Sequence, residues 1–102
     1  MYLARFSYAV QPVNRQRALD FIQREVEAAA RIPLKARLLV PLTRAHADAS
    51  LQFEVELQSL DQFEKFRDCG IESDQETGKW MRAFSEILLA PPAVELLRIQ
   101  DV

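Results

Sequence analysis

Polar and apolar residues alternate one by one along LQFEVELQS, which spans positions 51–59. A period of two residues is typical of a strand with one apolar and one polar face. The polar face of this strand carries Glu54 and Glu56, so the surroundings of that face decide what the two carboxylates do. Alternation also predicts a strand over residues 2–11, and a mostly apolar run predicts another from Lys35 to Thr43.

The segment between the first two strands has the spacing of a helix. Apolar residues recur every three or four positions after Asn14, the expected N-cap, and the helix should end before Pro33. Charged residues of this segment, Glu25 among them, are expected on its solvated side. The apolar stripe of the helix consists of Leu19, Ile22, Val26 and Ala29.

Two capping boxes predict where the later helices begin. Ser59 is followed by Gln62 and Ser73 by Glu76, the spacing at which a hydroxyl and an amide or carboxylate cap a first turn. Gly70 is expected to end the first of these helices. The closing segment VELLRIQDV, positions 94–102, predicts a last strand. The helix that begins after Ser73 has an apolar face formed by Trp80, Phe84, Ile87 and Leu88.

The predicted element order is β-α-β-β-α-(α)-β, and it fills residues 1–102 as a single domain. Two β-α-β halves with short connections indicate an α+β fold, the ferredoxin-like βαββαβ sandwich. We expect a four-stranded antiparallel sheet in the strand order 4-1-3-2. The helices should cover one face of this sheet.

The other face of the sheet is expected to be mixed in character. The central strands place Arg5, Glu54 and Glu56 there, and the second strand adds Arg37 and Leu39. The last strand is apolar on both sides, so the sequence leaves open which side it turns to this face. A strand of that kind is usually covered on both faces. The mixture fits a sheet that packs against a second sheet around a partly polar cavity.

This layout resembles the dimeric α+β barrel superfamily, which includes NIPSNAP-like and antibiotic-biosynthesis-monooxygenase-like proteins. The resemblance covers essentially the whole chain. It rests on the element order, the helix start from Ser59 to Phe66, the stretch KWMRAFSEILLAPP at positions 79–92 and the closing VELLRI. It implies a homodimer in which two ferredoxin-like subunits pair sheet to sheet, with a small-molecule pocket within the barrel or between sheet and helices.

The same resemblance implies several activities. Some members of the superfamily are cofactor-free oxygenases or isomerases, and others degrade haem with a ligating histidine. The one histidine of this chain, His46, lies in a predicted loop, which departs from the haem-degrading pattern. A lone histidine also lacks the further ligands that a metal site needs. We therefore expect no metal and no cofactor.

Composition and charge narrow the classes of partner. The formal net charge is −2, from 13 basic and 15 acidic residues, so we expect neither a nucleic-acid nor a membrane partner. An RNA-binding module of this topology would need aromatic rings where Glu54 and Glu56 lie. A regulatory domain of the ACT type favours glycine where this chain has QPVN, positions 11–14. One cysteine and no signal-peptide pattern indicate a cytoplasmic protein.

Glu54 and Glu56 are the candidate catalytic residues. They should lie about 6–7 Å apart on one strand face. In an enclosed site, like-charge crowding and burial would raise a carboxyl pKa and provide a general base. The alternative is that Arg5 and Arg37 neutralise both glutamates in structural ion pairs.

The candidate ligand-binding residues are Arg5, Tyr8, Arg37, Trp80 and Phe84. Tyr8 would offer a phenol to a pocket, whereas the two helix aromatics would line it; packing in the core is the alternative role for these three. The sequence thus predicts a small homodimeric α+β barrel protein that binds a small apolar or aromatic molecule. The alternative function is a cofactor-free monooxygenase or isomerase that uses a strand carboxylate as general base.

Overall fold

The computed structural model describes residues 1–43, 50–70 and 73–101 of the chain. Strands and helices follow one another along the chain in the order that the hydrophobic pattern predicts. The elements are, in chain order, β1 (Tyr2–Tyr8), the 3-10 turn η1 (Pro12–Asn14), α1 (Arg15–Arg31), β2 (Ala36–Leu39), β3 (Leu51–Leu57), α2 (Leu60–Cys69), α3 (Asp74–Ser85) and β4 (Ala93–Arg98).

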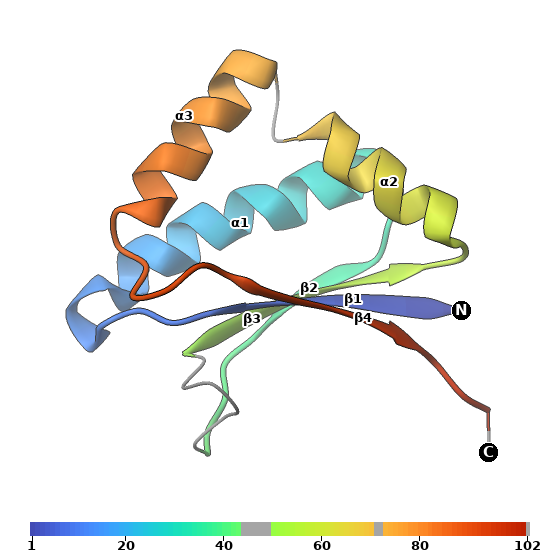
Figure 1. The fold of residues 1–102 in the computed structure, drawn as a ribbon, viewed down its shortest axis with the longest axis horizontal. Helices are drawn as coiled ribbons and strands as arrows, with labels where there is room; N and C mark the ends of the chain where they lie inside the picture. The colour runs from blue at the N-terminus through green and yellow to red at the C-terminus, as the bar shows by residue number, and fades with distance from the viewer. Residues whose placement is uncertain (44–49, 71–72, 102) are drawn as a thin grey trace.

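The four strands form one antiparallel sheet in the order β2-β3-β1-β4. The three helices α1, α2 and α3 all lie on one side of this sheet, and none of the described helices lies on the opposite side (Figure 1). This arrangement confirms the predicted α+β sandwich, its strand order and its helix-covered face. Among the described helices, none is long and apolar enough to cross a bilayer.

The pairing register decides which side chains share a face. Arg5 is paired with Glu54 on β3 and with Glu95 on β4, so these three residues lie on the face without helices. Leu3 and Leu97 are also paired, and they lie on the same face. The odd-numbered side of β4 therefore faces away from the helices, which settles the ambiguity that the sequence left. We call this helix-free side the open face.

The core lies between the helices and the other side of the sheet. Phe53 and Val55 of β3 are fully buried there, because their strand is central and their side chains point toward α1. Ile22 of α1 is equally buried against them. The rest of the buried apolar cluster comprises Ala4, Tyr8, Val10, Ala18, Ala29, Leu51, Leu57, Phe84 and Ile87.

The predicted helix starts are confirmed at both capping boxes. The Ser59 hydroxyl accepts a hydrogen bond from the Gln62 amide, and the Ser73 hydroxyl accepts one from the Glu76 amide at 3.1 Å. Asn14 does precede α1, but its side chain makes no capping hydrogen bond. Asn14 therefore marks the start of α1 correctly, but it does not cap the backbone N–H groups of the first turn with its side chain.

The second strand is shorter than predicted. The apolar run from Lys35 to Thr43 suggested nine residues, but the ladder ends at Leu39. Pro41 has no backbone N–H to donate to a ladder, which explains why pairing stops just before it. Val40 lies beyond the strand and is 43% exposed.

The two glycines of the chain should respond oppositely to substitution by alanine. Gly70 has a φ of 61°, and a Cβ there would lie 2.4 Å from the Thr77 hydroxyl oxygen. Gly78 lies inside α3, where a Cβ would meet nothing within 4 Å. We expect Gly70→Ala to lower the free energy of unfolding by about 1–2 kcal/mol and Gly78→Ala to raise it by about 0.5–1 kcal/mol. Urea denaturation of both variants tests this, and equal shifts would contradict it.

Candidate functional site

An apolar cavity of about 340 Å³ lies between α1, α3 and the end of the sheet formed by β1 and β4. Its inner part is formed by buried side chains, and its outer part by residues that are exposed to solvent. Met81 and Val94 are 58% and 52% exposed, so they mark the entrance. The residues that line the cavity are Phe6, Tyr8, Glu25, Trp80, Met81, Phe84, Ser85, Leu88, Pro92 and Val94.

A hydrogen-bonded pair of titratable side chains lies inside this apolar cavity. The Tyr8 hydroxyl donates to Glu25 Oε1 at 2.7 Å. Tyr8 comes from the central strand β1 and is 3% exposed, whereas Glu25 comes from the middle of α1 and is 6% exposed. Most buried carboxyl groups are paired with a cation or hydrogen-bonded several times. This one has a single side-chain donor among the described residues.

Burial changes the acid–base properties of both groups. Removal from water raises the pKa of the Glu25 carboxyl to about 7, although the Tyr8 hydrogen bond acts in the opposite direction. Burial, and then the negative charge on Glu25, raise the pKa of the Tyr8 phenol above its ordinary value. Tyr8 therefore remains a hydrogen-bond donor, and Glu25 changes its protonation state near neutral pH.

Aromatic rings surround the pair. The Phe84 ring lies 4.9 Å from the ring of Tyr8 and 5.6 Å from that of Trp80, measured between centroids. The Phe84 ring also stacks on Phe21, with the centroids 5.0 Å apart. The Trp80 indole N–H donates to the backbone carbonyl of Phe21 at 3.0 Å, which joins α3 to α1. The cavity wall is thus fixed by ring contacts as well as by a directed hydrogen bond.

The structure brings together three of the ligand-binding residues that the sequence singled out, Tyr8, Trp80 and Phe84. That they bind a ligand stays a prediction. The expectation that Glu25 lies on the solvated side of its helix is wrong. Glu25 falls on one face with Ala18, Ile22 and Ala29, at spacings of four, three and four residues. That spacing is visible in the sequence, and it was the signal that could have identified this carboxylate.

The other predicted residues lie on the open face of the sheet. The Arg5 Nε donates to Glu54 Oε2 at 2.7 Å, and Arg37 donates to Glu54 Oε1 through its Nε at 3.0 Å and its Nη2 at 2.9 Å. Glu54 is 2% exposed beneath these two guanidinium groups. Burial alone would raise its pKa, but the hydrogen bonds and charges of Arg5 and Arg37 outweigh it and lower the pKa.

This ion-pair cluster matches the structural alternative for Glu54. A carboxylate with a lowered pKa and both oxygens occupied is a weak general base at neutral pH. Glu54 and Glu56 both border a small hollow, which Leu3 and Arg37 also line. The volume of this hollow is about 50 Å³. A hollow of that size is far below the roughly 300–1,000 Å³ of ligand pockets. The catalytic role of the two glutamates stays a prediction that this geometry does not favour.

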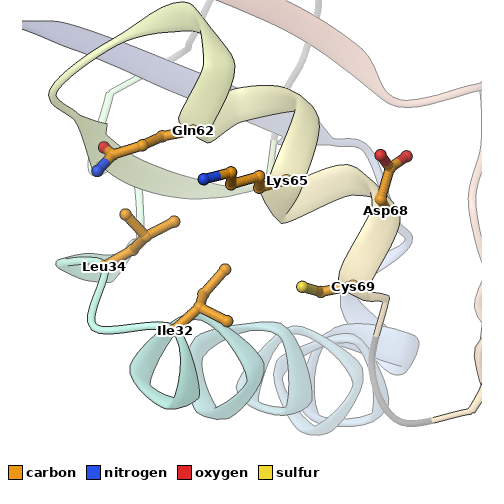
Figure 2. A pocket seen from close by; sticks show the side chains of 6 residues that line it. All are labelled: Ile32, Leu34, Gln62, Lys65, Asp68 and Cys69. Atoms are coloured by element: carbon orange, nitrogen blue, oxygen red, sulfur yellow. The ribbon is translucent and has the colours of Figure 1, made fainter.

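A second hollow, of about 420 Å³, lies between the end of α1 and helix α2 (Figure 2). The side chains of Lys65 and Cys69 point over it from α2, and Ile32 forms part of its floor. Its polar residues are at least partly exposed, so water already solvates them. It is larger than the α1–α3 cavity but contains no buried polar group that would recognise a ligand.

Metal-ligand clusters are absent from the residues that the structure describes, since no group of three or more His, Cys, Asp or Glu side chains converges there. His46, the predicted loop histidine, lies within residues 44–49, outside the described residues. Cys69 is exposed at the end of α2. The titratable groups that the fold does bring together are those of the cavity and of the open face.

Solved structures with the same architecture are numerous. One is a crystal structure of an antibiotic biosynthesis monooxygenase, with a TM-score of 0.72, 14% identity and coverage of 99% of this chain and 100% of that one. A protein of Arabidopsis thaliana gives a TM-score of 0.75 at 11% identity, covering 100% and 98% of the two chains. An uncharacterised NIPSNAP domain protein from Burkholderia xenovorans gives 0.72 at 12% identity, covering 98% and 95%.

The chain shares its fold with these proteins. This confirms the predicted resemblance to antibiotic-biosynthesis-monooxygenase-like and NIPSNAP proteins at the level of architecture. No protein-family model and no curated protein sequence matches the chain. At identities of 10–16%, the structural likeness concerns the fold alone. The function of this protein therefore depends on which side chains its own sequence places on that fold.

Proposed function

We propose that the protein binds a small apolar or aromatic molecule in the cavity between α1, α3 and the sheet. The observation that carries this proposal is a buried carboxyl–phenol pair enclosed by aromatic walls in a cavity of about 340 Å³. Ligand pockets are mostly apolar, of roughly 300–1,000 Å³, with a few polar groups that orient the ligand. The single cysteine fits a reducing compartment, so we expect this role in the cytoplasm.

The sole tryptophan of the chain provides a direct test, because Trp80 lines the cavity. Ethylbenzene and 2-phenylethanol should change the Trp80 fluorescence in a saturable manner. Val94→Phe should abolish this change by filling the entrance from β4. Leu96→Phe is the matched control, since Leu96 lies on the same side of β4 but outside the cavity wall. Equal binding by both variants would place the probes elsewhere and refute the proposal.

We also propose that the chain forms a homodimer through the open face. This face combines the charged cluster around Glu54 with the apolar side chains of Leu3 and Leu97. Leu97 is 36% exposed in the single chain, and every residue of β4 is exposed. A second sheet would cover these apolar groups, and the two arginines could reach carboxylates across the interface.

The dimer predicts a molar mass of twice 11.7 kDa in solution. Size-exclusion chromatography with light scattering over a dilution series measures this directly. Leu97→Glu should convert the dimer to a monomer, because it introduces a charge into the apolar part of the proposed interface. Leu96→Glu should leave the dimer intact, since Leu96 lies on the opposite side of β4. A wild-type monomer at all concentrations would contradict the proposal.

A second candidate function is a cofactor-free enzyme, a monooxygenase or isomerase, with a carboxylate as general base. The raised pKa of Glu25 inside the cavity favours this candidate, because an efficient base titrates near the working pH. The sequence had suggested a strand carboxylate for this role, whereas the geometry favours Glu25 on α1. The base would remove a proton from a ligand C–H next to a carbonyl group, and the same oxygen would return it.

Proton exchange tests this second candidate without knowledge of the natural substrate. In D₂O, the wild type should accelerate loss of the α-proton signals of 2-tetralone in NMR spectra by about 100-fold or more over buffer. Glu25→Gln should abolish the acceleration, and Glu27→Gln, an exposed position on the same helix, should not. Loss in Glu54→Gln alone would instead support the strand carboxylate. No acceleration by the wild type would remove the candidate.

A further inference from the structure

Within the described part of the chain, no positive charge compensates Glu25 in its cavity. Its side-chain hydrogen-bond partner is the neutral hydroxyl of Tyr8, and no cation of the described chain lies within salt-bridge distance of it. Glu54 differs in this respect, because that carboxylate is also nearly inaccessible to solvent but is covered by two guanidinium groups that pair with it. Described cations therefore compensate the charge of Glu54, whereas the charge of Glu25 has only the Tyr8 hydrogen bond.

A buried carboxylate without a counter-charge has two ways to reduce its cost. It can take up a proton, or it can contact a cation that enters the same low-dielectric site. Burial raises the pKa of Glu25, so proton uptake reduces this cost in the protein alone. Glu25 lines the cavity, so a group that enters from the side of Met81 and Val94 can reach it.

The walls of the cavity also favour a cation over a neutral polar group. The rings of Phe6, Tyr8, Trp80 and Phe84 all line it, with Glu25 among them. The face of an aromatic ring attracts a cation by about 0.5–2 kcal/mol, depending on how dry the site is. A neutral hydroxyl would gain a hydrogen bond to Glu25 but only a weak contact with the rings. An ammonium group would gain from both.

We propose that the cavity selects a primary amine in its protonated form, carried on an apolar or aromatic body, with the ammonium group on the Glu25 carboxylate. Tyr8 donates to one carboxylate oxygen and so holds the carboxylate in place, while the apolar body of the ligand packs on Trp80 and Phe84. The inference rests on the proposed binding function and specifies the class of ligand for that same cavity.

Two probes of nearly equal shape test the inference, 2-phenylethylamine and 2-phenylethanol. Their affinities are measured by isothermal titration calorimetry at pH 8, where alkyl ammonium groups, with a pKa of about 10, remain charged. For the wild type, the amine should bind at least about tenfold more tightly than the alcohol. Glu25→Gln should remove this preference, so that the amine and the alcohol bind with affinities within about threefold of each other. Glu27→Gln should behave as the wild type.

The outcomes separate the two proposals. Equal affinities of the amine and the alcohol for the wild type would overturn the choice of ligand class and leave the binding function standing. An amine preference that survives in Glu25→Gln would also overturn the inference, because the preference would then arise elsewhere. Failure of both probes, together with no response of Trp80 fluorescence, would refute the binding function itself. The wild-type comparison alone keeps the inference testable if a variant fails to fold.

Discussion

Replacing Glu25 with glutamine should stabilise the protein at pH 8 and have little effect at pH 4. The pKa of Glu25 is about 7 in the folded state, above its value of 4.5 in an unfolded chain, so the folded state favours the protonated form. The stability that this provides is present below pH 4.5 and is lost as the pH rises through 7. The difference between the two pKa values corresponds to about 3 kcal/mol in the free energy of unfolding. Glu25→Gln has no carboxyl group at this position and does not lose this stability as the pH rises.

Urea denaturation of the wild type and of Glu25→Gln from pH 4 to pH 8 measures this effect. The free energy of unfolding should depend on pH with a different slope in the two proteins. The glutamine carbonyl can still accept from the Tyr8 hydroxyl, so the variant removes the charge and retains the hydrogen bond. Glu27→Gln on the exposed side of α1 should follow the wild type at every pH. Glu54 titrates in all three proteins alike, and its contribution cancels. Parallel curves for wild type and Glu25→Gln would show that Glu25 is not held in an apolar site.

Phe84→Ala should cost about 3–5 kcal/mol of the free energy of unfolding, a large part of the stability of a domain this size. Phe84 is 3% exposed, and its ring contacts the rings of Tyr8, Phe21 and Trp80. Its removal would leave a void beside the existing cavity, and the surrounding rings are fixed by their own contacts. Thermal and urea denaturation measure the loss.

The matched control for Phe84→Ala is Met81→Ala on the same helix. Met81 also lines the cavity, but it is 58% exposed, so its truncation should change the free energy of unfolding by no more than about 0.5 kcal/mol. The indole emission of Trp80 should shift in Phe84→Ala under native conditions, because the ring at 5.6 Å is gone. A small loss in Phe84→Ala would mean that α3 packs less closely on β1 than described.

The fold was predictable because its signals are local. Alternation along β3 and the capping serines at Ser59 and Ser73 each act within a few residues, and the element order that such signals predict fits few topologies. The length of β2 was harder to predict, because an apolar run does not show where the partner strand stops. The orientation of β4 was also undetermined, since only its register with β1 distinguishes its two apolar sides.

The candidate site was only partly predictable, for a different physical reason. Tyr8, Trp80 and Phe84 were found because aromatic residues on apolar faces point inward, whether or not a ligand binds there. Glu25 was missed because a charged residue on an amphipathic helix is far more often solvated. Its burial depends on the rotation of α1 over the sheet, and a shift of the apolar stripe by one residue reverses the assignment. The arginine partners of Glu54, by contrast, follow directly from strand pairing.

Strand β1 contributes side chains to both faces of the sheet, but each of its side chains lies on one face only. Tyr8 points into the cavity and Arg5 to the open face, because successive strand residues alternate sides. The proposed ligand binding and the proposed dimer contact should therefore respond to separate substitutions three positions apart. If the apparent ligand affinity depends on protein concentration, the coupling must pass through a displacement of the β1 backbone itself. Such coupling would be reciprocal, so the ligand would then strengthen the dimer by the same factor as the dimer strengthens ligand binding.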